Sequence, residues 1–141
     1  SPERAGTDLI VALETVMHVT RRRSVAFLIS DFYAPDYGRA LSLAAARHDI
    51  IPIMLTDPRD IELPDVGLAS FEDLETGESV IVDTSSAQVR AHYAKQMRRQ
   101  QSETVQLFNK LGLDHCVVRT DRPYITPLRD LFARRARRIR R

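Results

Sequence analysis

Two short apolar runs, each followed by an aspartate, most constrain the fold of this chain. Residues 24–30 (Ser-Val-Ala-Phe-Leu-Ile-Ser) lead into Asp31, and residues 49–56 (Asp-Ile-Ile-Pro-Ile-Met-Leu-Thr) lead into Asp57. Short runs that are apolar throughout are typical of strands in parallel sheets, which are buried on both faces. We therefore expect residues 24–30 to form a central strand. Pro52 makes the second run a weaker candidate for a central position.

Segments with helical spacing of apolar residues separate these runs. Residues 7–20 show such spacing, and Thr7 is placed to cap the helix that it predicts. Asp36 is expected to start a second helix, which ends near Arg47. A third helix is predicted from Ser85 or Ser86 to Leu111, because Gly112 supplies a stop signal.

An acidic segment interrupts the alternation of helix and strand. Residues 67–71 and 79–83 are predicted to form a β-hairpin, since turn residues separate two short strand-like runs. Between Asp57 and Glu78 the chain carries eight acids against Arg59 alone, a net charge of −7. Two interpretations stay open for this segment: a solvated surface loop, or a docking element near the strand ends.

The order of elements predicts an α/β fold. With a further strand over residues 115–120 and a last helix after it, the pattern gives a Rossmann-like parallel sheet with flanking helices and an inserted β-hairpin. Such sheets usually have more than three strands, and this chain opens on a helix. We therefore expect the front part to be missing, so that residues 1–141 form a partial domain.

Residues 128–141 are predicted to form a basic C-terminal helix. Residues 129–141 hold seven arginines and one aspartate, so the sequence pI of 9.0 reflects this tail and gives no support to a nucleic-acid partner. We expect the arginines to face water and complement the helix dipole, so that deleting residues 134–141 costs little stability. Peripheral contact with an anionic membrane, or with an acidic partner, is the alternative. The apolar side chains expected to pack on the sheet are Leu128, Leu131, Phe132 and Ile139.

Composition excludes several classes of protein. The single cysteine, Cys116, cannot form an internal disulfide, and its apolar neighbours predict a buried structural thiol. No apolar stretch approaches the ~20 residues that cross a bilayer, and the first residues do not resemble a signal peptide. These observations lead us to expect a cytoplasmic protein.

Asp31 and Asp57 are the candidate site residues, because ligands of open α/β sheets bind beyond the carboxyl ends of the strands. Mg²⁺ prefers carboxylate and hydroxyl oxygens, which Asp31, Ser30 and Thr7 can offer. The alternative is that each aspartate begins a loop or caps a helix. The sequence has no metal-type histidine spacing, no glycine-rich phosphate loop and no nucleophile elbow, so we do not expect an enzyme.

Several motifs in order resemble a known family. The chain looks like the von Willebrand factor A-like domain of the uncharacterised bacterial proteins (domain of unknown function fifty-eight) that are often encoded beside MoxR-type AAA+ ATPases. The resemblance covers nearly the whole chain up to the basic tail. It is carried by Gly6-Thr7-Asp8-Leu9, Phe27-Leu28-Ile29-Ser30-Asp31-Phe32, Arg47-His48-Asp49, Asp57-Pro58-Arg59-Asp60, Leu63-Pro64 and Glu72-Asp73-Leu74-Glu75-Thr76-Gly77.

The resemblance implies a metal-ion-dependent adhesion site at the carboxyl edge of the sheet. In the family pattern a D-x-S-x-S loop, a threonine and an aspartate surround Mg²⁺. Thr7 matches the threonine and Asp31 the aspartate, whereas no segment of this chain matches the loop. A Mg²⁺ site is therefore expected only in the intact protein, with no tightly bound metal in residues 1–141.

The expected function is a protein-interaction module, an adaptor or cofactor of a MoxR-type AAA+ ATPase. The alternative is a Mg²⁺-dependent phosphohydrolase or nuclease that uses Asp31 and Asp57 as paired carboxylates. A missing neighbour strand would also leave a sheet edge unpaired beside residues 24–30, which predicts self-association through that edge.

Overall fold

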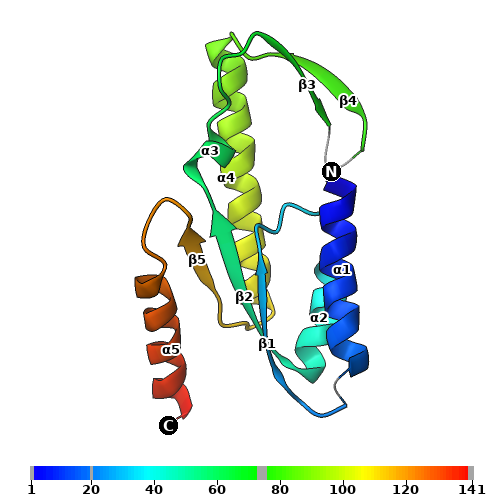
Figure 1. The fold of residues 1–141 in the computed structure, drawn as a ribbon, viewed down its shortest axis with the longest axis vertical. Coiled ribbons are helices and arrows are strands. Elements are labelled where there is room, and N and C mark those ends of the chain that lie inside the picture. The colour runs from blue at the N-terminus through cyan, green and yellow to red at the C-terminus, as the bar shows by residue number, and fades with distance from the viewer. Residues whose placement is uncertain (1, 20, 73–75, 140–141) are drawn as a thin grey trace.

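The structure, a computed structural model, describes residues 2–19, 21–72 and 76–139, without the side chains of residues 2–8 and 139. Figure 1 shows an elongated α/β molecule with the hairpin at one end and the C-terminal helix near the other. The helices are α1 (Pro2–Val19), α2 (Gly38–Arg47), α3 (Pro58–Ile61), α4 (Ala87–Lys110) and α5 (Ile125–Ile139). The strands are β1 (Val25–Ser30), β2 (Asp49–Thr56), β3 (Leu68–Glu72), β4 (Ser79–Asp83) and β5 (Cys116–Arg119).

A parallel sheet of the order β1-β2-β5 organises the domain. Val25 of β1 is level with Asp49 of β2, and Ile53 of β2 is level with Cys116 of β5. The α/β, Rossmann-like fold expected from the sequence is therefore confirmed. The hairpin is confirmed as well, because β3 and β4 pair antiparallel as a separate two-stranded sheet.

The central strand is β2, so the expectation that Pro52 disfavours a central position is wrong. The backbone N–H of Asp49 donates to Ser24 on the β1 side, whereas the carbonyl of Thr56 accepts from Thr120 on the β5 side. Successive residues of a strand direct these groups to alternate sides, which places the nitrogen of Pro52 on the β5 side. Pairing with β5 begins only at Ile53. The missing N–H of Pro52 therefore removes no bond from the sheet.

The main core covers one face of the sheet. Side chains from α1, α2 and α4 pack there against β2, and Figure 1 shows these helices on the same side of the sheet. Phe108 of α4 is 0% exposed, with its ring centroid 4.9 Å from that of Phe32. The buried members of this core are Leu9, Leu13, Phe32, Tyr37, Leu41, Ala44, Ile50, Met54 and Phe108.

The opposite face of the sheet is covered only over β2 and β5. Leu131 of α5 packs there in a second cluster with Ile51, Ile53, Cys116 and Val118. The expectation that residues 24–30 form a central strand buried on both faces is therefore wrong. The strand β1 lies at the sheet edge and alternates between half-buried and exposed residues, because α5 does not extend over it.

Two predicted helix starts need correction. Thr7 lies within α1, which begins at Pro2, so it does not cap that helix. Proline suits the first turn of a helix, where its missing N–H is not needed. Asp36 does not start α2, because it has a φ of 60° and the helix begins at Gly38. The start of α4 is confirmed, since the Ser86 side chain accepts a hydrogen bond from the N–H of Val89.

The C-terminal helix is fixed by an arginine that the sequence interpretation assigned to water. The side chain of Arg135 is only 17% exposed and forms ion pairs with Asp49 at the start of β2 and with Asp114 before β5. Its Nη1 donates to Asp114 Oδ2 over 2.7 Å. Arg138 also pairs with Asp114. The expectation that all the arginines face water is therefore wrong for Arg135, which joins α5 to the sheet, and these ion pairs argue against the expectation that deleting residues 134–141 costs little stability.

Candidate functional site

The loop after β1 presents Asp31 to solvent at the carboxyl edge of the sheet. Two side-chain turns shape it: Ser30 Oγ accepts from the N–H of Phe32 at 3.0 Å, and Asp31 Oδ1 accepts from the N–H of Tyr33 at 3.0 Å. Phe32 has a φ of 60°, a left-handed conformation that is strained for a bulky residue. Burial of the Phe32 ring in the main core holds this conformation. Asp31 is thereby fixed in position while its side chain stays exposed.

The carboxylate of Asp57 is already hydrogen-bonded to nearby residues. It accepts from the backbone N–H and the guanidinium of Arg59, and from Thr120 Oγ1 at 3.0 Å. Asp60 completes a capping box by accepting from the N–H of Asp57, so that Asp57 caps the short helix α3. The hydrogen bonds from Arg59, followed by the one from Thr120, hold the pKa of Asp57 well below its ordinary range.

The register of the sheet separates the two candidate aspartates. Ser30 is level with Met54, so Asp31 follows at the level of Leu55, two residues before Asp57. With a rise of ~3.3 Å per residue and a strand spacing of ~4.8 Å, their Cα atoms lie roughly 8 Å apart. The paired-carboxylate alternative, a phosphohydrolase or nuclease, remains a prediction, which this offset permits but which the bonds of Asp57 to Arg59 and Thr120 do not favour.

The described residues do not complete a Mg²⁺ site around Asp31. The side chain of Thr7, the other predicted ligand, lies outside the described part of the chain. Ser30 Oγ is already an acceptor for the N–H of Phe32, and Asp57 is bound by Arg59. Among the described residues there is no group of three or more histidine, cysteine, aspartate or glutamate side chains that could hold a metal ion. A Mg²⁺ site at Asp31 therefore stays a prediction.

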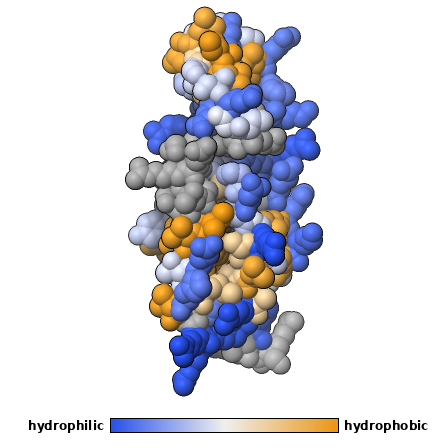
Figure 2. All heavy atoms as spheres, turned by 90° about the vertical axis from the view of Figure 1, so that its right-hand side faces the viewer, coloured by the Kyte–Doolittle hydropathy of each residue, from blue (hydrophilic) through white to orange (hydrophobic). Residues whose placement is uncertain are grey.

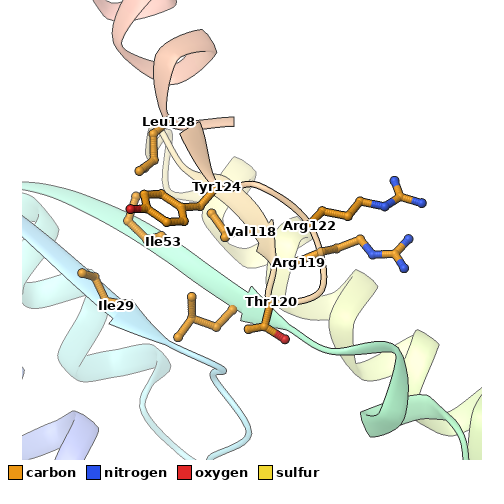
Figure 3. A pocket seen from close by; sticks show the side chains of 9 residues that line it. Ile29, Ile53, Val118, Arg119, Thr120, Arg122, Tyr124 and Leu128 are labelled. Carbon is orange, nitrogen blue, oxygen red and sulfur yellow. The ribbon is translucent and has the colours of Figure 1, made fainter. Parts of the chain in front are cut away.

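An apolar pocket of about 350 Å³ opens at the same edge of the sheet, on the face that carries α5. Its polar lining comes from the end of β5 and the following loop, through Arg119, Thr120 and Arg122. Figure 3 shows both guanidinium groups projecting the same way, away from the apolar side chains. Sequence interpretation missed this pocket, although arginines directly after a predicted strand are a usable signal. The apolar lining consists of Ile29, Ile53, Leu55, Val118, Tyr124 and Leu128.

The two arginines at the pocket differ in the partners that they bind. Arg119 forms an ion pair with Asp121 at 2.9 Å. The side chain of Arg122 forms no hydrogen bond or ion pair with residues that the structure describes. The pKa of Asp121 lies below its ordinary value, chiefly through its hydrogen bond from Arg119 and to a lesser extent through the charge of Arg122. The rim of the pocket therefore offers one guanidinium that is free to bind an anionic group.

The single cysteine lies in the second cluster under α5. Cys116 is buried, as predicted, and this burial raises the pKa of its thiol, opposed to a smaller degree by the charge of Arg134. Within the described ranges, none of the helices combines the length and the apolar character that a bilayer crossing requires.

Comparisons with known proteins give a family but no function. The family described as "Protein of unknown function DUF58" matches residues 1–103. An uncharacterised protein of Mycobacterium avium is 36% identical over 122 residues, which are 86% of this chain and 72% of that protein. Uncharacterised proteins of Mycobacterium bovis and Mycobacterium tuberculosis are 33% identical over 139 residues, and the chain spans only 43% of their length. No solved structure gives a significant match.

Proposed function

We propose, from the premise that this chain belongs to the DUF58 family of proteins of unknown function, that it is a protein-interaction module. The observation that carries the proposal is the presentation of Asp31. A strained turn, anchored by the buried ring of Phe32, holds an exposed carboxylate at the sheet edge where α/β domains bind ligands. A rigid support under an exposed polar residue is what a recognition surface needs, because binding then orders little additional chain.

In this proposal Mg²⁺ binds tightly only to the intact protein, which supplies ligands in addition to those of residues 1–141. Asp31 would supply one carboxylate and Thr7 one hydroxyl to Mg²⁺, as the resemblance to von Willebrand factor A-like domains implies. The remaining ligands would come from sequence outside this chain, and mycobacterial relatives more than twice as long leave room for it. Bound there, Mg²⁺ would supply a coordination position for an acidic side chain of the partner.

The proposed partner is a MoxR-type AAA+ ATPase, for which the chain would act as an adaptor or cofactor. The support for this partner is the family resemblance. The localisation proposed with it is the cytoplasm.

A pull-down with the intact protein tests the proposed function. In the presence of Mg²⁺ we expect the wild-type protein to retain the ATPase, and Asp31→Asn to reduce the retained amount at least ~10-fold, because the substitution removes the ligand charge. Asp36→Asn is the matched control, since Asp36 is an exposed aspartate of the same loop and asparagine tolerates its positive φ. Retention that is equal for wild type and Asp31→Asn, or unchanged by chelation, would contradict the proposal.

Residues 1–141 alone are expected to bind Mg²⁺ weakly, with a dissociation constant no better than about 1 mM, or ~4 kcal/mol. Mg²⁺ dehydrates reluctantly and requires near-octahedral ligation, so two protein oxygens leave it mostly hydrated. Isothermal titration calorimetry measures this constant directly. Micromolar affinity would show that this chain contains ligands beyond Thr7 and Asp31.

A further inference from the structure

The outer face of the β3–β4 hairpin is apolar and acidic. Alternation along the two strands turns Phe71 toward α4, where its ring centroid lies 6.3 Å from that of Tyr93. Leu68 and Ile81 therefore share the other face, and each is 75% exposed. The strand pairing places Glu72, Ser70, Ser79 and Asp83 on this face as well, with Ser70 opposite Ile81 and Asp83 opposite Leu68. Figure 2 shows hydrophobic surface gathered at the upper end of the molecule, the end where β3 begins and β4 ends in Figure 1.

A second exposed apolar surface lies between β1 and α5. Val25, Phe27 and Ile29 project from the uncovered face of β1 and are 48–64% exposed. On the α5 side, Phe132 is half-exposed, and its ring centroid lies 5.9 Å from that of Phe27. Ile29 also lines the apolar pocket, so the surface is continuous with it. We call this surface the β1–α5 groove.

The charges at the two surfaces are opposite. The groove ends at the pocket rim with Arg119, which is paired with Asp121, and with Arg122, whose guanidinium supplies the remaining positive charge. The hairpin face carries Glu72, and Glu78 lies in the turn just before β4. An apolar centre bordered by opposite charges is the arrangement that gives interfaces both affinity and orientation. The dimensions agree as well, since five-residue strands span ~17 Å and the six residues of β1 span ~20 Å.

We propose that the outer face of the hairpin docks into the β1–α5 groove of a second copy of this chain. Figure 1 places the hairpin and α5 at opposite ends of the long axis, so the two surfaces cannot meet within one copy. The contact joins different surfaces of the two copies, so the pair keeps one free groove on the first copy and one free hairpin on the second. This geometry produces head-to-tail chains or a closed ring. The inference does not depend on the metal site or on the ATPase.

Sedimentation velocity over a range of protein concentrations tests the inference with residues 1–141. We expect wild-type association to weaken at least ~10-fold between low and high salt, because exposed charges are screened. Arg122→Glu and Glu72→Lys should each weaken it at least ~10-fold. The double variant, which exchanges the two charges, should recover most of the wild-type affinity. Arg39→Glu, a reversal at an exposed arginine of α2, is the matched control and should have no effect.

Mixing the two single variants sharpens the experiment. Each is weakened alone, yet in the mixture the reversed groove of one variant suits the reversed hairpin of the other, and the unchanged hairpin and groove form the wild-type contact. The mixture should therefore recover association, with the two variants alternating. Circular dichroism would verify folding, which exposed substitutions should leave intact. A wild type that stays monomeric overturns the inference. Association that ignores salt and both reversals also overturns it, because it points to edge-to-edge pairing of β1. So does loss with Arg122→Glu alone, which means that the groove binds something other than the hairpin.

Discussion

Phe108→Ala is expected to lower the free energy of unfolding by about 3–5 kcal/mol. The Phe108 ring is fully buried between the sheet and the strained loop after β1, with its centroid 4.9 Å from that of Phe32 and 5.3 Å from that of the His115 ring. Removing it leaves a cavity that Phe32, fixed by its backbone turn, cannot fill. Domains of this size are stable by only ~5–15 kcal/mol, so the variant should unfold at markedly lower denaturant concentration.

A surface phenylalanine provides the matched control for this measurement. Phe132 is half-exposed, so Phe132→Ala should cost about 1 kcal/mol in urea unfolding. The Phe108 substitution should also disturb the presentation of Asp31, because Phe32 loses its main contact. Equal destabilisation by the two variants would mean that the core is not centred on Phe108.

Arg135→Ala is expected to lower the free energy of unfolding by about 2–3 kcal/mol. Breaking a fully buried ion pair costs about 3–5 kcal/mol, and the partial exposure of Arg135, Asp49 and Asp114 reduces this value. The loss is large because one guanidinium holds two carboxylates. After the substitution Asp114 keeps its ion pair with Arg138, whereas Asp49 loses the cation that faces it. The apolar pocket should open at the same time, since Leu128 and Tyr124 form its α5-side wall.

Two further variants distinguish this role from general basic charge. Arg137→Ala removes an exposed arginine from the same helix and should change stability by less than ~0.5 kcal/mol. Arg135→Lys keeps the charge but cannot contact both carboxylates with a planar fork, so its effect should lie between those of the two alanine variants. If all three variants unfold at the same urea concentration, the ion pairs of Arg135 do not anchor α5.

The sequence predicted the elements wherever local signals agreed with one another. Apolar runs, glycine stops and a serine cap placed β2, the hairpin and α4 within two residues. Gly112, which ends α4, has the positive φ of 69° that makes glycine the suitable residue there. These signals depend only on neighbouring residues, and a single sequence displays them directly.

The sequence could not predict properties that depend on distant segments. An apolar run such as that of β1 has the same appearance in a central strand and in an edge strand with an uncovered face. The tolerance of Pro52 at the centre of the sheet depends on where β5 begins. The residues near Arg135 in the sequence give no indication of its ion pair with Asp49, which lies 86 residues away.

The sequence predicted where the candidate site lies more accurately than it predicted which residues form it. Both aspartates follow strands, as expected, and Asp31 is exposed at the sheet edge. Asp57 serves as the cap of α3, a helix of four residues that is too short to show periodicity. Arg122 and Tyr124 escaped notice because their role depends on a pocket formed by β1, β2, β5 and α5 together.

The shape of α4 has a consequence for how the molecule opens. Only Thr104 and Phe108 of this helix are buried, and both lie in the part that crosses the sheet. The part from Ala87 to about Gln100 holds the hairpin through half-buried side chains and through Arg90, whose guanidinium donates to the carbonyl of Thr84. Regions with few buried contacts exchange their amide hydrogens through local openings well below the global unfolding energy. The hairpin and the first turns of α4 therefore form a less stable cooperative unit, which can unfold and refold while the parallel sheet stays intact.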